Sequence, residues 1–110
     1  MKVKWTPSAK KQWRDTAKYI QKKFGVKVRE AFMQDVLQTT LLLGNHPKMG
    51  VMEPFLADQQ WEYRSFVVNR LNKIVYRLED NVIYIVAFWD TRKEPQNQAQ
   101  QLKDTDTPQS

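Results

Sequence analysis

At 110 residues, the chain is long enough for one domain, with one core layer between a sheet and a few helices. It has no cysteine and a single histidine, which excludes disulfides, thiolate metal sites and multi-histidine metal sites. Its net charge is +6, no apolar run approaches the ~20 residues of a membrane span, and the N-terminus lacks the apolar core of a signal peptide. We therefore expect a cytoplasmic protein that needs no metal or cofactor.

Positive charge is concentrated at the N-terminus. The first 29 residues hold ten Lys or Arg and one acid, Asp15. Such a balance attracts polyanions, either phosphate backbones or an acidic protein partner. A lysine-coated helix that only keeps the protein in solution has the same pattern, and charge alone leaves both interpretations open.

The N-terminal half predicts a short strand and a helical hairpin. Residues 2–5 suit the strand, and Thr6 and Pro7 suit the N-cap and the first position of a helix. Apolar residues follow at spacings of three and four: Ala9, Trp13, Ala17, Ile20 and Phe24. Gly25 ends this helix, and a second helix runs to Gly44-Asn45. Its inward residues are expected to be Val28, Phe32, Val36 and Leu43. Two helices joined by one glycine predict an antiparallel pair.

The C-terminal half predicts a three-stranded meander. After a loop at residues 46–50 and an irregular stretch to about Gln60, we expect strands at residues 63–68, 73–79 and 82–89, with turns at 69–72 and 80–81. We expect residues 1–95 to form the domain and residues 96–110, which are mostly polar, to be a disordered tail. The prediction is an α+β fold with its helices packed on one face of an antiparallel sheet.

Alternation along these strands predicts a basic face. If the turn at residues 69–72 leaves Val68 opposite Lys73, then Arg64 lies opposite Arg77. The basic face then carries Arg64, Phe66, Val68, Lys73, Val75, Arg77, Tyr84, Val86, Phe88 and Asp90. We expect the helices to cover the other, apolar face, which leaves the cations open to an anion. The alternative is that Arg64 and Arg77 pair with Glu62, Asp90 or Glu94 in an ordinary surface network.

Several segments in this order resemble the RelE/ParE superfamily of toxins from type II toxin–antitoxin systems. They are Tyr63-Arg64-Ser65, Lys73-Ile74-Val75-Tyr76-Arg77-Leu78, Trp89-Asp90-Thr91-Arg92, His46-Pro47-x-x-Gly50 and Glu53-Pro54. The likeness covers roughly residues 1–95. It implies the strand, helical hairpin and meander already expected from the residues.

The resemblance implies one of two activities. RelE-like members cleave mRNA in the ribosomal A site, a reaction that needs cations around the phosphate and acid–base help. By resemblance, Arg64, Lys73 and Arg92 match basic positions of that site, and Glu53 matches the general base of the YoeB branch. We expect Arg77, Tyr84, Lys93 and Arg70 to extend the nucleic-acid-binding surface. ParE-like members share the fold and instead poison DNA gyrase through protein contacts.

Departures from the RelE pattern keep the second activity open. No His or Tyr follows Tyr84, so a general acid for the leaving oxygen is not visible, and lysine at position 73 cannot grip a phosphate bidentately. We expect mRNA cleavage, with gyrase inhibition or a non-catalytic antitoxin-binding module as alternatives.

Each alternative includes an acidic antitoxin that folds over the toxin, with the lysine-rich first helix and Trp5, Trp61 and Trp89 as candidate contacts. His46 is interpreted as a loop residue without a catalytic role.

Overall fold

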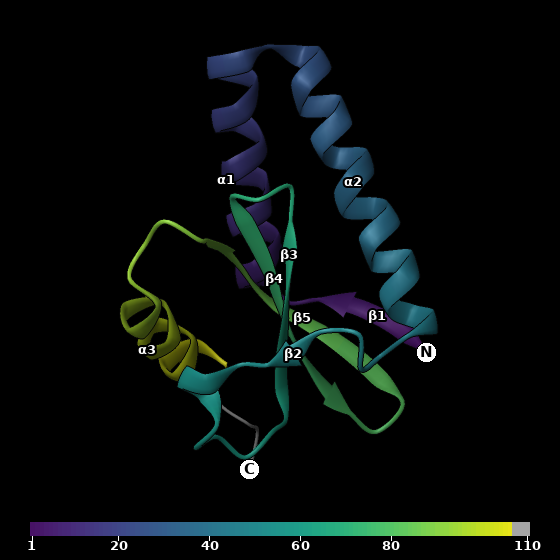
Figure 1. Ribbon diagram of the computed structural model, residues 1–110, viewed down its shortest axis with the longest axis vertical. Coiled ribbons are helices and arrows are strands. Elements are labelled where there is room, and N and C mark those ends of the chain that lie inside the picture. The colour runs from purple at the N-terminus through teal and green to yellow at the C-terminus, as the bar shows by residue number, and fades with distance from the viewer. Residues whose placement is uncertain (107–110) are drawn as a thin grey trace.

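The computed structural model describes residues 1–106 and shows two helices on one face of a five-stranded mixed sheet (Figure 1). Its elements are β1 (Lys2–Trp5), α1 (Pro7–Phe24), α2 (Val26–Asn45), β2 (Val51–Met52), the short 3-10 helix η1 (Pro54–Leu56), β3 (Tyr63–Val68), β4 (Asn72–Glu79), β5 (Val82–Asp90) and α3 (Pro95–Thr105). The strand order is β1-β5-β4-β3-β2, with β1 parallel to β5 and the other pairs antiparallel. The α+β class and the order of strand, helical hairpin and meander are confirmed. No helix among residues 1–106 combines the length and apolarity of a membrane span.

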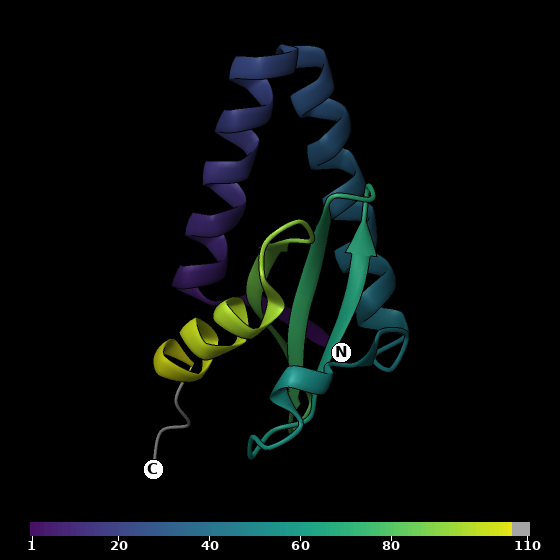
Figure 2. The ribbon, with the colours of Figure 1, turned by 60° about the vertical axis from the view of Figure 1, so that its left-hand side comes forward.

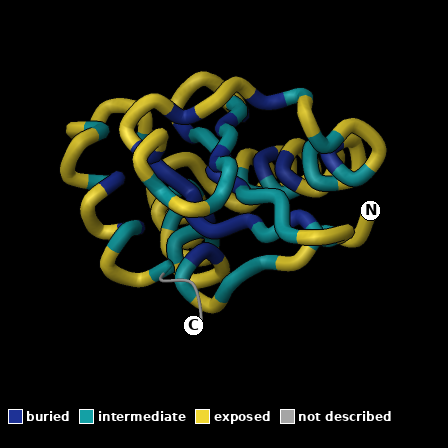
Figure 3. The backbone as a smooth tube through the Cα atoms, turned by 90° about the horizontal axis from the view of Figure 1, so that it is seen from below, coloured by how far each residue is buried: buried dark blue, intermediate teal, exposed yellow. Residues whose placement is uncertain are grey.

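The helical hairpin forms where the sequence predicts it. The hydroxyl oxygen of Thr6 accepts a hydrogen bond from the backbone N–H of Ala9, at 3.2 Å, and Pro7 is the first residue of α1. Gly25 separates the helices with φ of +96°, a backbone conformation that favours glycine. The buried residues of the hairpin (Ala9, Ala17, Phe32, Val36 and Leu43) pack against the sheet and form the main core. In Figure 3 the yellow, exposed stretches lie mainly on the outside and the dark blue, buried stretches towards the middle.

The predicted register between β3 and β4 is wrong by one residue. Val68 pairs with Asn72 and Val67 pairs with Lys73, so Arg64 lies opposite Tyr76, not opposite Arg77. The loop has three residues because Asn72 joins β4, where its side-chain amide donates to the carbonyl oxygen of Trp89. Positive φ angles at Asn69 and Arg70 make this tight loop possible. A one-residue change in loop length moves one strand's side chains to the other face relative to its neighbour.

A bulge in β5 changes a second part of the predicted face. Glu79 pairs with Val82 and Arg77 pairs with Tyr84, as expected from the two-residue turn. The pairing then shifts, since Tyr76 lies opposite Ile85 and Val75 lies opposite Ala87. Val86 is the extra residue, and beyond it the alternation is reversed. Phe88 therefore packs in the main core under the helices, where the sequence placed it on the basic face.

The second face of the sheet is covered in part by α3. Residues 96–110 were predicted to be a disordered tail, but residues 96–105 form most of α3 (Pro95–Thr105), and residues 107–110 lie outside the described residues. Ala99 and Leu102 are buried in a second apolar cluster, whose other members are Leu56, Tyr63, Val75, Val86, Ala87 and Trp89. Figure 2 shows α3 beside the sheet, apart from the helical hairpin. The stretch predicted to be irregular also contains β2 and η1, and η1 packs against α3.

Candidate functional site

The predicted cations do not share one open face. Register pairs point to the same side of a sheet, so Lys73, Arg77 and Tyr84 lie on the face that α3 partly covers. Arg64 pairs with Tyr76, whose side chain belongs to the core under the helical hairpin, and therefore lies on the opposite face. The prediction of a shared Arg64–Arg77 face is wrong. The one-residue change in register between β3 and β4 moves Arg64 to the other face relative to Lys73 and Arg77.

Arg64, on β3, is held by acceptors of its own chain. Its Nε donates to a carboxylate oxygen of Glu62 at 2.8 Å, and its Nη1 donates to the carbonyl oxygen of Gly50 at 2.7 Å. The ion pair with Glu62 is one that the sequence left open as the alternative to anion binding. Gly50 is essential to this packing, because a Cβ there would lie 2.7 Å from the carbonyl oxygen of Ser65 and 2.9 Å from the Tyr76 side chain.

Lys73 and Glu53, both predicted catalytic residues, contact each other. The Lys73 ammonium nitrogen lies 2.8 Å from a Glu53 oxygen and 5.2 Å from the centroid of the Trp89 ring. The Glu53 side chain is only 2% exposed, and that of Lys73 is 20% exposed. A carboxylate so enclosed cannot reach a ribose hydroxyl of an RNA bound outside. The pair is a buried internal ion pair in this conformation.

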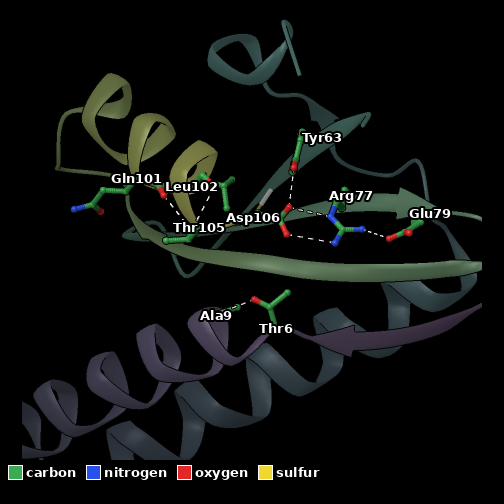
Figure 4. A network of polar contacts seen from close by, with 9 residues as sticks. All are labelled: Thr6, Ala9, Tyr63, Arg77, Glu79, Gln101, Leu102, Thr105 and Asp106. Atoms are coloured by element: carbon green, nitrogen blue, oxygen red, sulfur yellow. Dashed lines mark hydrogen bonds and ion pairs between the residues drawn. The ribbon is translucent and has the colours of Figure 1, made fainter. Parts of the chain in front are cut away.

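Arg77 is the centre of a network of polar contacts (Figure 4) and also lies against two aromatic rings. Its Nε donates to Asp106 Oδ2 at 2.9 Å, and its Nη2 donates to Asp106 Oδ1 at 3.3 Å. Glu79 accepts from the third nitrogen, and the rings of Trp61 and Tyr84 lie 5.1 and 4.6 Å from the guanidinium carbon. Burial of Arg77 disfavours its charge, but the hydrogen bonds and charges of Asp106 and Glu79 outweigh this and raise its pKa.

Tyr63 completes this network from β3. Its hydroxyl donates to Asp106 Oδ2 at 2.7 Å. Burial, followed by the hydrogen bond to the Asp106 carboxylate, raises the Tyr63 pKa well above its ordinary value. The Tyr63 hydroxyl therefore stays protonated at neutral pH, where it donates a hydrogen bond and does not release its proton to a leaving group.

The predicted residues Arg92 and Lys93 precede the N-terminal end of α3, and Arg70 lies in the β3–β4 loop. Arg92 forms two hydrogen bonds to the Asp90 carboxylate, at 3.0 Å each, and its side chain is 60% exposed. The hydrogen bond from Arg92 lowers the pKa of Asp90. Lys93 and Arg70 are exposed, and the Thr91 hydroxyl bonds the carbonyl oxygen of Arg70. Arg92 and Lys93 line a cleft of about 740 Å³ between α1, the β3–β4 loop and α3.

These positions do not form a phosphate clamp. Arg64, Lys73 and Arg77 each have a carboxylate of this chain within ion-pair distance, and they come from two faces of the sheet. Phosphoryl chemistry needs several unpaired donors converging on one group. Among residues 1–106, no three His, Cys, Asp or Glu side chains are grouped as a metal site requires.

The comparisons with known proteins agree with this fold. Residues 3–95 match the family model described as ParE toxin of type II toxin-antitoxin system, parDE. This chain belongs to the ParE toxin family. A solved structure titled "Chromosomal ParDE TA system from P. aeruginosa" has 18% sequence identity to it and a TM-score of 0.67. That match covers 82% of this chain and 95% of the other. The comparison with curated proteins finds no match.

Membership in the ParE family establishes this chain as a type II toxin with an antitoxin as its partner. The family match ends at residue 95, where α3 begins, so the helix that carries Asp106 lies outside the matched region of this ParE-family chain. Sequence reasoning missed Asp106 and Tyr63 as partners of Arg77, and it named Trp61 only as a candidate antitoxin contact. A correct β3 register would have assigned Tyr63 to the Arg77 side of the sheet. No sequence pattern points to Asp106, because it follows a polar stretch with a single large apolar residue, Leu102.

Trp89, a candidate antitoxin contact, is buried under α3 and packs as a core residue. Trp5 is partly buried against the main core, and its ring lies 5.9 Å from that of Trp13. His46 is an exposed residue at the end of α2, in the loop where it was expected.

Proposed function

We propose that this ParE-family toxin acts by binding a protein target, DNA gyrase, and not by cutting mRNA. The observation that supports this is the separation and internal pairing of the cations that an RNA-cleaving site would need. Arg64 lies on one face with Glu62, and Lys73 lies on the other with Glu53. Gyrase as the target places the action of the toxin in the cytoplasm.

A protein-binding role also agrees with the surface of the helical hairpin. The connected ends of α1 and α2 project beyond the strands in Figure 1. Large apolar side chains are exposed along the hairpin: Tyr19, Phe24, Val26, Val28, Leu37, Leu41 and Leu42. Exposed apolar groups among charges are typical of protein interfaces, and the ten cations of the first 29 residues favour an acidic partner. We expect both the antitoxin and the target to be partners of this kind.

The test is a pair of assays on toxin freed of antitoxin. Plasmid supercoiling by purified gyrase is followed over a toxin titration, and transcript ends are mapped in a translating extract that receives the same toxin. We expect supercoiling to be inhibited, cleaved DNA to accumulate and transcripts to stay intact. Gyrase activity that is unaffected at saturating toxin would refute the proposal.

Two variants separate the mechanisms further. Arg92→Ala removes an exposed side chain that the RelE-like reaction would use, and Lys27→Ala removes an exposed cation of α2, outside the predicted nucleic-acid surface, as a control. A nuclease would lose transcript cleavage in Arg92→Ala alone. Cleaved transcripts from the wild type, lost in Arg92→Ala and retained in Lys27→Ala, would establish mRNA cleavage instead. A wild type that is harmless on overexpression without antitoxin would support the non-catalytic module.

A further inference from the structure

The apolar face of the helical hairpin continues past the part of it that the sheet covers. Phe24 follows Ile20 by four residues and Val28 precedes Phe32 by four, so each pair shares one side of its helix. Ile20 packs against the main core and Phe32 is buried in it, whereas Phe24 and Val28 are 57% and 47% exposed. Among residues 18–31, which form the connected ends of α1 and α2, no residue is buried. The apolar face is therefore uncovered at this end of the hairpin.

Phe24 and Val28 line the cleft of about 740 Å³ that also contains Arg92 and Lys93. Leu71, in the β3–β4 loop, lines the same cleft and is 46% exposed. Figure 2 shows the connected ends of the hairpin projecting past this loop. We call this space the hairpin cleft, and its apolar lining consists mainly of Ile20, Phe24, Val28, Phe32 and Leu71. Its size and apolar lining suit the side chains of a partner.

The carboxylates of the hairpin cleft are already paired within the chain. The Lys11 ammonium nitrogen lies 2.7 Å from an Asp15 oxygen, and the Arg92 guanidinium lies 3.0 Å from an Asp90 oxygen. Each acid is balanced by a cation of its own chain, so neither repels an acidic partner strongly.

Two lysines of the hairpin cleft have no such partner. Among residues 1–106, no carboxylate lies within ion-pair distance of Lys23 or Lys93. The Lys23 ammonium nitrogen lies 5.7 Å from the centroid of the Tyr19 ring, which also lines the cleft and is 49% exposed. The unbalanced charge at this cleft is positive, which favours a partner with acidic groups.

We infer that the hairpin cleft is the surface through which this toxin binds DNA gyrase, and that it takes an apolar segment of gyrase flanked by acidic residues. This inference rests on the proposed function. The apolar side chains of the segment lie against Phe24, Val28 and Leu71, and its carboxylates face Lys23 and Lys93. A DNA phosphate backbone would gain from the two lysines but would leave the apolar side chains uncovered, so the cleft favours a protein.

The experiment compares Phe24→Ala with Leu41→Ala. Phe24 and Leu41 are 57% and 58% exposed, and Leu41 lies on α2 outside the hairpin cleft. Labelled toxin freed of antitoxin is titrated with purified gyrase in the absence of DNA, and the same toxins are then titrated in a supercoiling assay. We expect Phe24→Ala to bind gyrase at least about ten times more weakly than Leu41→Ala, and to inhibit supercoiling with a half-maximal concentration at least about ten times higher.

A second arm tests the charge of the cleft without changing its apolar lining. Lys23→Glu reverses an unpaired cation at the cleft, and Lys10→Glu makes the same change at an exposed position of α1 outside it. We expect Lys23→Glu to bind gyrase at least about ten times more weakly than Lys10→Glu, because it places like charges opposite each other. Added salt should weaken binding of the wild type more than binding of Lys23→Glu. Circular dichroism checks that all four variants are folded, as expected for exposed positions.

The outcomes separate this inference from the proposed function. A wild type that neither binds nor inhibits gyrase would refute both. A wild type that inhibits gyrase, with Phe24→Ala equal to Leu41→Ala and Lys23→Glu equal to Lys10→Glu, would refute the hairpin cleft alone. Variants that inhibit gyrase normally but no longer bind the antitoxin would overturn the inference in favour of an antitoxin surface. Binding of the wild type to plasmid DNA alone, lost in Lys23→Glu, would overturn it in favour of a nucleic-acid site.

Discussion

Substitution of Lys73 by Met tests whether the Glu53–Lys73 pair holds the fold together. The Glu53 side chain is 2% exposed and its oxygen lies 2.8 Å from the Lys73 ammonium nitrogen. Lys73→Met keeps the side-chain length but leaves a buried carboxylate without its cation. Breaking a buried ion pair in this way costs about 3–5 kcal/mol, a large part of the total stability of a small domain.

The measurement is urea unfolding followed by circular dichroism. With a slope of about 1.5 kcal/mol per molar urea, the midpoint should fall by about 2–3 M. The control is Arg92→Ala, which breaks the exposed Arg92–Asp90 pair and should cost less than about 1 kcal/mol. If Lys73→Met costs no more than Arg92→Ala, the carboxylate of Glu53 does not depend on Lys73 and the reasoning is wrong.

The double variant Glu53→Met with Lys73→Met extends this test to function. Replacing both charges by apolar side chains of similar volume removes the uncompensated carboxylate and should recover most of the lost stability. If the pair is structural, the double variant should also recover toxicity in a growth assay. A nuclease that uses Lys73 and Glu53 would remain inactive although folded.

Two further outcomes are expected. Gly50→Ala should destabilise the protein by about 1–3 kcal/mol, because its Cβ would meet the Ser65 carbonyl and the Tyr76 ring; a melting temperature equal to that of the wild type would contradict the close approach. Tyr63 has a pKa raised above 10.0 by burial and by Asp106, so its stabilising contribution is complete below about pH 10 and is lost as the pH rises beyond it. Unfolding midpoints of the wild type and Tyr63→Phe should therefore differ more at about pH 8 than at about pH 11, and a constant difference would argue against a neutral, buried phenol.

Local signals in the sequence determined most of the elements. Thr6, Pro7 and Gly25 act through backbone geometry and neighbouring hydrogen bonds, and the helix they delimit was predicted to its ends. The two-residue turn at Asp80-Asn81 likewise gave the correct pairing of Glu79 with Val82. Such features depend on residues a few positions apart, and a sequence pattern contains that information.

The tertiary structure alone decided which side chains meet. Whether Asn72 belongs to the loop or to β4 depends on its bond to Trp89, and this one residue separates Arg64 from Lys73 and Arg77. Likewise, α3 is short and polar, and its docking depends on the burial of Leu102 and on Arg77 and Tyr63, which bind Asp106 from more than 25 residues away in the chain. The sequence determined most of the elements because their energetics are local. Contacts between segments far apart in the chain decided which residues pair with the cations, and a local sequence pattern contains no information about the energies of such contacts.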